Sequence, residues 1–409
     1  MRHDHALIAN IKFTVALALA MFMGWLAPGA FAAAEPSEYA RKIFDGYYDG
    51  MCKGHANVPA YVNEVYRALD DFPAIYQKVT GRDAGGPEHI KLKLADGEIS
   101  VPGAEESENA GLTDYVGGDV MVTLRVPVHI GRLRRVYDLV IHEMTHAVQR
   151  RDVGNGKDWD ANWPVWFREG IAVYVSAEVQ FKIDHVGLET LYNKNADPVT
   201  SLVGLQETRT ASNYAEWGVA VQALDETKPG QLGALIQWLY DKMGLAEGIQ
   251  SIYGIAWQDF VTRAQTAATA RFRAAFPEQA VTDFLGVQDA LKQRDAAKMK
   301  ALLEGIRNNA DWAKTPMHGT VLWELSLTHG VFKELDKSIE CLQLLMQEGP
   351  DDPQYENCFY NTYRILQMQN KFDDAKAGYL KVMADFPAKP KLVKNCQDRL
   401  AEIEKAQAK

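Results

Sequence analysis

The chain has 409 residues, of which 47% are hydrophobic and 24% are charged, a composition typical of folded globular protein. This length exceeds one ordinary hydrophobic core and favours two or three domains. The net charge of -10, without a long run of Lys and Arg, argues against a protein that binds nucleic acid through its phosphates.

The first segment differs in composition from the rest of the chain. Arg2 and Lys12 precede the apolar run FTVALALAMFMGWLA, and the small-x-small sequence Ala-Phe-Ala ends at Ala32. This pattern predicts a secretory signal peptide over residues 1–32. The alternative, an uncleaved membrane anchor, is less favoured because the apolar run is short for a span. We therefore expect a periplasmic or secreted protein with no membrane attachment after cleavage.

Patterns of apolar residues predict both helices and strands in the next part of the chain. Helical spacing is found over residues 37–54, 59–81, 133–151, from 162 onward, and in pieces over 211–276. Alternating and β-branched runs predict strands over Ile90 to Gly97 and Gly117 to Val128. This part is expected to be a mixed α and β domain.

The last part of the chain contains an internal repeat. The segments beginning at Gly330 and at Asn370 superpose with an offset of forty residues, which predicts helix-turn-helix units. The second segment, NKFDDAKAGYLKVMADFP, resembles a tetratricopeptide repeat, and a plain helical bundle is the alternative. The predicted organisation is a signal peptide over residues 1–32, a domain over 33–277 and a helical-repeat domain over 278–409.

The cysteines leave disulfide formation open. An oxidising compartment permits pairing, and one bridge among the last three cysteines is plausible, whereas the alternative is buried free thiols. The four residues are Cys52, Cys341, Cys358 and Cys396.

The stretch VIHEMTHAVQ contains the pattern His-Glu-x-x-His. His142 and His146 are four residues apart, so on a helix both imidazoles can reach one ion at about 2 Å. Glu143 is turned by about 100° from His142, so its carboxylate lies beside the metal and can act as a general base. With 10 histidines in the chain, chance would produce this pattern in roughly one or two such chains per hundred.

A third ligand is needed, because a catalytic zinc ion usually takes three protein ligands. In WFREGIAVY, Glu169 is one turn into the next predicted helix, and Gly170 permits that helix to approach its neighbour closely. The sequence therefore predicts one zinc ion per chain, bound by His142, His146 and Glu169. An ordinary exposed helical Glu is the alternative for Glu169.

HEMTH followed by Glu169 in a W-x-x-E-G-x-A-x-Y frame resembles the gluzincin metallopeptidases, in which two His and a downstream Glu bind zinc. The sequence Glu-Gly-Ile-Ala is also similar to the corresponding segment of the basic secretory proteins, which have Asp where this chain has Val173. The resemblance spans about Ile90 to Phe276. It implies an α+β fold in which a zincin-like metallopeptidase domain precedes the all-α helical-repeat region.

Gluzincin aminopeptidases also carry a Tyr that stabilises the oxyanion, in a Tyr-x-x-Gly pattern with a Leu ten residues on. Tyr214 and Leu224 have that spacing, although Trp217 replaces the Gly. The resemblance thus implies Tyr214 as a second catalytic residue. Tyr174 and His185 are the competing candidates, and a tyrosine that only packs in the core is the alternative.

Other segments are candidates for the substrate cleft. GDVMVTLRV is predicted to be an edge strand that an extended peptide could pair with. GAEESENAG, residues 103–111, is faintly similar to the exopeptidase signature of those aminopeptidases but lacks its Met and is predicted to be a loop. Trp159, Trp163 and Trp166 either line the cleft or fasten a loop to the core.

The sequence as a whole predicts a secreted or periplasmic zinc metallopeptidase that hydrolyses peptide bonds, with Glu143 as general base. Its partners would be a peptide or protein substrate and a possible protein partner at the C-terminal repeats. The alternative is a catalytically silent protein of peptidase fold that binds peptides or proteins through its helical repeats.

Overall fold

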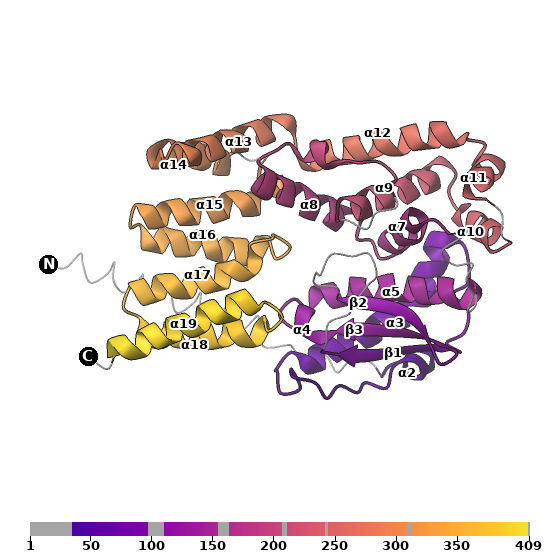
Figure 1. Ribbon diagram of the computed structural model, residues 1–409, viewed down its shortest axis with the longest axis horizontal. Coiled ribbons are helices and arrows are strands. Elements are labelled where there is room, and N and C mark those ends of the chain that lie inside the picture. Colours follow the sequence, from indigo (N-terminus) through magenta and orange to yellow (C-terminus); the bar gives the residue numbers. More distant parts are fainter. Residues whose placement is uncertain are drawn as a thin grey trace, which may run out of the picture. The chain divides into compact units, whose positions relative to one another are not determined.

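The computed structural model describes residues 35–96, 110–153, 163–206, 211–241, 244–309 and 312–407. This described part contains seventeen α-helices and one mixed three-stranded sheet (Figure 1), so the predicted α+β class is confirmed. The predicted signal peptide, residues 1–32, lies outside these ranges. None of the described helices is long and apolar enough to cross a membrane.

The sheet has the strand order β1-β3-β2. β3 is parallel to β1 and antiparallel to β2. The strands are β1 (Ile90–Ala95), β2 (Gly111–Val116) and β3 (Asp119–Arg125). β1 and β3 place alternate residues in the interior, as in β3, where Val120, Val122 and Leu124 are buried.

The prediction of one strand over residues 117–128 was wrong at both ends. Gly117 and Gly118 have φ angles of 63° and 98° and form the two-residue turn of a β-hairpin, a conformation that glycine adopts without strain. The strand before this turn, β2, was missed. Because β3 lies between its two neighbours, β2 rather than β3 forms the sheet edge beside the HEMTH helix.

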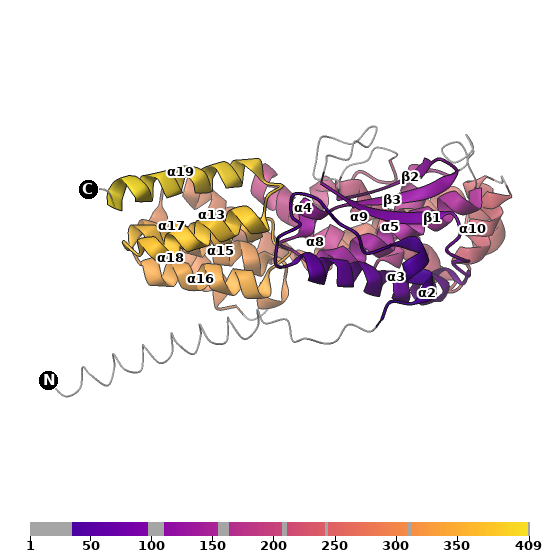
Figure 2. The same ribbon diagram turned by 90° about the horizontal axis from the view of Figure 1, so that it is seen from below.

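One long helix connects the sheet to the rest of the fold. α5 (Arg134–Val153) packs against all three strands and against α3 (Val58–Thr80), as Figures 1 and 2 show. α3 ends at Gly81, as predicted, with a left-handed φ of 74°. The predicted helix over residues 37–54 is helical only in α2 (Glu38–Ile43), and the short α4 (Val126–His129) precedes α5.

The helices that follow α5 end largely where the sequence predicts. Pro164 immediately precedes α7, Gly244 precedes α11, and Gly254 ends α11 with a φ of 74°. The unpredicted helix α8 begins after Ala177, which has a φ of 60° and turns the chain at the end of α7. These helices are α7 (Val165–Val175), α8 (Val179–Glu189), α9 (Ala211–Thr227), α10 (Leu232–Tyr240), α11 (Leu245–Tyr253) and α12 (Trp257–Ala275).

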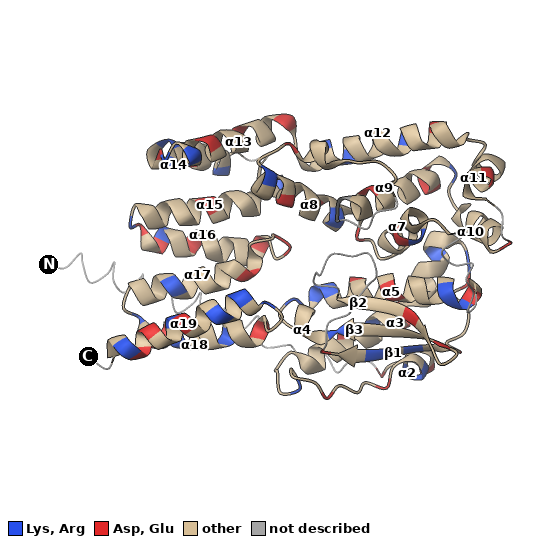
Figure 3. Ribbon diagram, viewed as in Figure 1, with Lys and Arg blue, Asp and Glu red and all other residues tan. Residues whose placement is uncertain are grey.

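The remaining helices pack one against the next in sequence order (Figure 1). Acidic and basic residues are interspersed along them (Figure 3). They are α13 (Glu278–Lys292), α14 (Ala296–Arg307), α15 (Met317–Val331), α16 (Leu335–Glu348), α17 (Tyr355–Met368), α18 (Phe372–Asp385) and α19 (Pro390–Gln407).

The same turn occurs three times in this region. Arg294, Lys333 and Asn370 have φ angles of 56°, 59° and 60°, and the amide of the next residue is hydrogen-bonded to the carbonyl five residues before it. The turns define three helix pairs, α13 with α14, α15 with α16 and α17 with α18. The sequence comparison had found only two units.

The spacing of these turns also corrects the predicted offset of forty residues. From 294 to 333 is 39 residues, and from 333 to 370 is 37. The sequence match was therefore three residues out of register for the last two units. A shift of three residues is close to one helical turn, so the apolar face still matched.

Buried apolar residues form three clusters. One contains residues from Ala40 to Ala264, the second residues from Val173 to Ile365, and the third residues from Ala375 to Ile403. The second cluster crosses the boundary predicted at residue 277, and residues 38–409 form one compact unit. The boundary stays a prediction, but the helices on its two sides share a core.

All four cysteines are buried free thiols, so the structure does not contain the disulfide considered among the last three. Cys341, Cys358 and Cys396 lie on α16, α17 and α19. Burial raises the pKa of Cys341 and of Cys396 to about 11, which keeps both as unreactive thiols at neutral pH.

Candidate metal centre

The HEMTH segment lies in the middle of α5, where every residue from Val140 to Gln149 is buried. His142 and His146 lie on one face of the helix, and their rings are 4.9 Å apart in an edge-to-face arrangement. Glu143 faces strand β2. Helix periodicity therefore separates the two imidazoles from the carboxylate, as the sequence predicts.

Helix α7 carries Glu169 to this face of α5. α7 is anchored by buried Trp166, Phe167 and Ile171, and it packs against both α5 and α9. A Cβ atom on Gly170 would lie 2.6 Å from the main-chain oxygen of Trp217 on α9, so this position has room only for glycine. Glu169 is 6% exposed and is not an ordinary surface glutamate.

Three side chains converge on one point. Glu169 Oε2 lies 3.0 Å from His146 Nε2 and 3.6 Å from His142 Nε2. One ligand atom of each of the three residues lies within 4.8 Å of the others, and the residues are 6–9% exposed. The structure thus brings together the three residues that the sequence predicts as metal ligands.

This arrangement fits a metal ion such as zinc. The donors are two imidazole nitrogens and one carboxylate oxygen, a set that zinc accepts at bond lengths of about 2 Å. Ligand atoms around a tetrahedral ion at such distances lie roughly 3.3 Å apart, close to the measured separations. Both imidazoles present Nε2 to the shared point, while their Nδ1 atoms have other partners.

Electrostatic interactions within the cluster shift the pKa values of His142 and Glu169. Burial opposes the charged form of His142, but hydrogen bonds to Glu169 and Glu178 outweigh burial and raise its pKa to about 10. Burial likewise opposes the charged form of Glu169, but the charge of His146 and hydrogen bonds from both histidines lower its pKa well below the ordinary range. The site thus favours a positive charge beside the carboxylate, and a metal cation would compete with the proton on His142.

The outer partners of the two histidines were not predicted. His142 Nδ1 lies 2.9 Å from Glu178 Oε2, and His146 Nδ1 lies 3.2 Å from Gln149 Oε1. Glu178 also accepts a hydrogen bond from Ser176 Oγ at 2.9 Å. Burial opposes the ionisation of Glu178, but Lys182 and His142 lower its pKa far below the ordinary value. Hydrogen bonds of this kind fix the orientation of metal-binding imidazoles.

Strand β2 holds the Glu143 side chain. Thr113 Oγ1 lies 2.7 Å from Glu143 Oε2 and 3.0 Å from the main-chain oxygen of the same residue. A Cβ atom on Gly111 would lie 2.6 Å from Glu143 Oε1. Glu143 is 6% exposed. The edge strand therefore determines where the candidate general base lies.

The three candidates for oxyanion stabilisation lie in different surroundings. The Tyr174 hydroxyl donates to Asp225 at 2.9 Å, and His185 Nε2 lies 3.3 Å from Glu189. The Tyr214 ring packs against Trp217 and lies 5.6 Å from Lys182 Nζ. Lys182 Nζ is in turn 3.8 Å from Glu178. Of the three, Tyr214 is the one linked to the metal-binding cluster through these contacts.

Two of the tryptophans considered for the cleft are core residues. Trp163 is 1% exposed and packs against Tyr240 with ring centroids 5.0 Å apart, and Trp166 is 2% exposed and packs against Phe260. They fasten α7 to its neighbours, which is the second of the two roles considered for these residues. Trp159 and most of the segment GAEESENAG lie outside the described residues.

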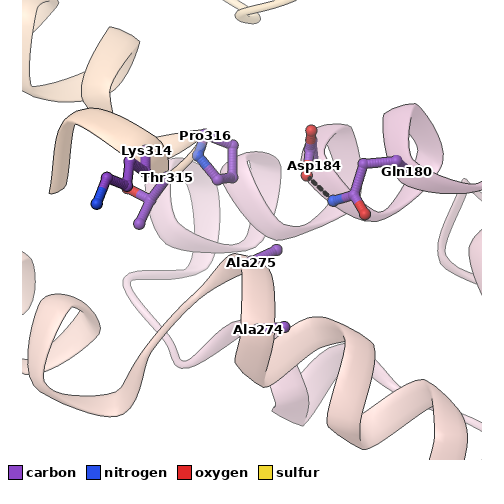
Figure 4. Close-up of a pocket in the computed structure, with 7 residues that line it drawn as sticks. All are labelled: Gln180, Asp184, Ala274, Ala275, Lys314, Thr315 and Pro316. Atoms are coloured by element: carbon purple, nitrogen blue, oxygen red, sulfur yellow. Dashed lines mark hydrogen bonds between the residues drawn. The ribbon is translucent and has the colours of Figure 1, made fainter. Parts of the chain in front are cut away.

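An open pocket lies elsewhere, between α8, the end of α12 and residues 314–316 (Figure 4). Gln180 on its wall donates a hydrogen bond to Asp184 at 2.7 Å. Burial raises the pKa of Asp184 to about 6. None of the predicted site residues lines this pocket, so it is distinct from the metal-binding cluster.

Comparisons with known proteins give no family assignment. No protein-family model matches the chain, and neither curated proteins nor solved structures gave a match. The geometry of the metal-binding cluster is therefore the basis on which a function is proposed for this chain.

Proposed function

We propose that this protein is a zinc-dependent peptidase of the gluzincin kind, with a zincin-like catalytic region and a helical-repeat region. In this proposal residues 1–32 direct export to the periplasm or secretion and are then removed. The observation that carries the proposal is the convergence of His142 Nε2, His146 Nε2 and Glu169 Oε2, with Glu143 on the same helix turn and its carboxylate hydrogen-bonded to Thr113 of β2.

The mechanism assigns each residue a role in peptide hydrolysis. His142, His146 and Glu169 would hold a zinc ion, which would supply Lewis-acid chemistry to a water molecule and to the peptide carbonyl. Glu143 takes a proton from the attacking water and delivers it to the leaving amine. The role assigned to Tyr214 is to stabilise the negative charge that develops on the carbonyl oxygen. Glu178 and Gln149 hold the two imidazoles in place.

Strand β2 gives the substrate a path past Glu143. Among the described strands, β2 pairs only with β3, so none of them covers its other edge. An extended peptide could add to this edge by main-chain hydrogen bonds, which would place its backbone near Glu143. The α13–α18 helix pairs are assigned to docking of a protein substrate or partner.

The test separates metal binding from catalysis. We expect about one zinc ion per chain and hydrolysis of a fluorogenic peptide library. Glu143→Gln should retain zinc and lose activity by a factor of about 10² to 10⁴, because the general base is removed. Glu304→Gln, at an exposed position on α14, is the matched control and should leave zinc content and hydrolytic activity unchanged.

Two results would reject the proposal in different ways. A chain without zinc, or one that keeps zinc after His142→Ala and His146→Ala, has no metal site at these residues. A chain that binds zinc but shows no hydrolysis, or the same hydrolysis after Glu143→Gln, is a binding protein instead.

A further inference from the structure

Gln149 lies three residues after His146 on α5 and is fully buried. Its Oε1 atom lies 3.2 Å from His146 Nδ1, on the side of the ring away from Glu169. Its Nε2 atom is buried and has no hydrogen-bond partner among the described residues. Among the described residues, His146 is thus the polar side chain with which the buried Gln149 amide forms a hydrogen bond.

The position of this amide matters because of how an imidazole binds metal. A ring that offers the Nε2 lone pair must carry its proton on Nδ1, and a buried N–H group needs an acceptor. Gln149 Oε1 is such an acceptor. Three residues after His146 on the same helix, it lies close to that ring without any contribution from a distant segment.

The two metal-binding imidazoles therefore have unlike partners. His142 is bonded to the Glu178 carboxylate, which comes from the turn between α7 and α8. His146 is bonded to a neutral amide from its own helix. A carboxylate strengthens the imidazole as a ligand through its charge, whereas an amide chiefly fixes tautomer and ring orientation.

We propose that Gln149 is a positioning residue of the metal centre, whose side-chain carbonyl holds His146 in the tautomer and orientation that direct Nε2 to the ion. This inference rests on the proposed zinc site and extends the working motif to His-Glu-x-x-His-x-x-Gln. It concerns the affinity and geometry of metal binding and does not depend on which substrate is cut.

The test measures metal binding directly on the full chain. Zinc affinity is obtained by competition with a chromophoric chelator, and ligand geometry from the visible absorption of the Co²⁺ form. Gln149→Leu removes the acceptor at similar volume, so its zinc Kd should rise about 10- to 100-fold, with shifted Co²⁺ bands. Gln149→Glu keeps an acceptor at the same reach and should bind zinc at least as tightly as the wild type.

Gln288→Leu is the matched control, because Gln288 is also a buried helical glutamine but lies on α13. It should leave the zinc Kd and the Co²⁺ bands unchanged. An unchanged Kd and spectrum in Gln149→Leu would overturn the inference.

If Gln149→Leu does not fold, the zinc Kd of Gln149→Glu is compared with that of Gln149→Asn to test the positioning role. The shorter Asn cannot reach His146 and should weaken zinc binding, whereas equal affinity of the two variants would reject the positioning role. A wild-type chain that binds no zinc would overturn the metal site itself, so the two failures are distinguishable.

Discussion

The Glu178 carboxylate contacts His142 from outside the metal-binding cluster. We expect Glu178→Gln to raise the zinc Kd about tenfold, because the amide can still accept from Nδ1 but lacks the charge that strengthens the imidazole as a ligand. Glu178→Ala should have a larger effect, up to about 100-fold. Competition with a chelator measures both.

Glu189→Gln provides the comparison, since Glu189 lies at the opposite end of α8 and pairs with His185 rather than with a cluster residue. A zinc Kd equal to the wild-type value in Glu178→Gln would show that the charge of Glu178 does not act on the site.

Gly111 lies against the Glu143 side chain. A methyl group at this position would come within 2.6 Å of Glu143 Oε1, so Gly111→Ala should push the carboxylate away from its place. A displaced base costs catalytic rate without removing a metal ligand, so we expect kcat to fall at least about tenfold with zinc content unchanged. Steady-state kinetics and metal analysis on the same sample check this, and a wild-type kcat would contradict it.

Some residues of the candidate metal site could be predicted from the sequence and others could not. The spacing of His142 and His146 and the local frame of Glu169 were sufficient to select the three residues that the structure brings together. Gln149 could have been found from its i+3 position. Glu178 could not, because its approach to His142 depends on the left-handed turn at Ala177, which no local pattern indicates.

At the scale of elements, the contact between α7 and α9 holds Glu169 in place. Gly170→Ala would bring a methyl group within 2.6 Å of a main-chain oxygen on α9, which must move α7. We expect a loss of about 1–3 kcal/mol in the free energy of unfolding, together with weaker zinc binding. Urea unfolding followed by circular dichroism gives the first quantity.

Gly286→Ala is the control for this helix substitution. Gly286 lies within α13, and an added Cβ would contact nothing within 4 Å. Here alanine should stabilise the protein by about 0.5–1 kcal/mol, since it removes backbone freedom from the unfolded chain. Equal effects of the two substitutions would mean that the α7–α9 contact is not tight.

Element boundaries were predictable where glycine and proline mark them, as at Gly81, Pro164 and Gly254. The hairpin turn at Gly117 and Gly118 was missed, because the β-branched run after it was extended backward through the glycines. The helix pair α13 and α14 was missed because the three helix pairs have the same turn conformation but different amino acids at the turn. Arg294, Lys333 and Asn370 have little in common as side chains.

For the molecule as a whole, two buried acids of the C-terminal region make stability depend on pH: Glu324 on α15 and Asp352 in the turn between α16 and α17. Burial raises the pKa of Asp352 and of Glu324 to about 7 from ordinary values near 4. The folded state thus binds these protons more tightly than the unfolded chain does. The associated stability is fully present below about pH 4 and is lost as pH rises toward 7.

We therefore expect the free energy of unfolding to fall between about pH 5 and pH 7, by roughly 1 kcal/mol per pH unit for each group. Asp352→Asn keeps the contact to the Gln354 amide and should remove part of this slope, with a gain in stability at pH 8. Urea unfolding of both proteins across this range is the measurement. A slope that does not change in the variant would contradict the assignment to Asp352.

The residues that contact the His142 and His146 imidazoles lie at very different sequence separations from them. His146 and Gln149 are three residues apart, so their contact can form as soon as α5 is helical, whereas Glu169 and Glu178 must close loops of 23 and 36 residues. Early in folding, α5 would present two of the three metal ligands, His142 and His146. A metal ion that holds all three ligands would then bind mainly after these loops close, and its removal by a chelator should speed unfolding more than it slows refolding.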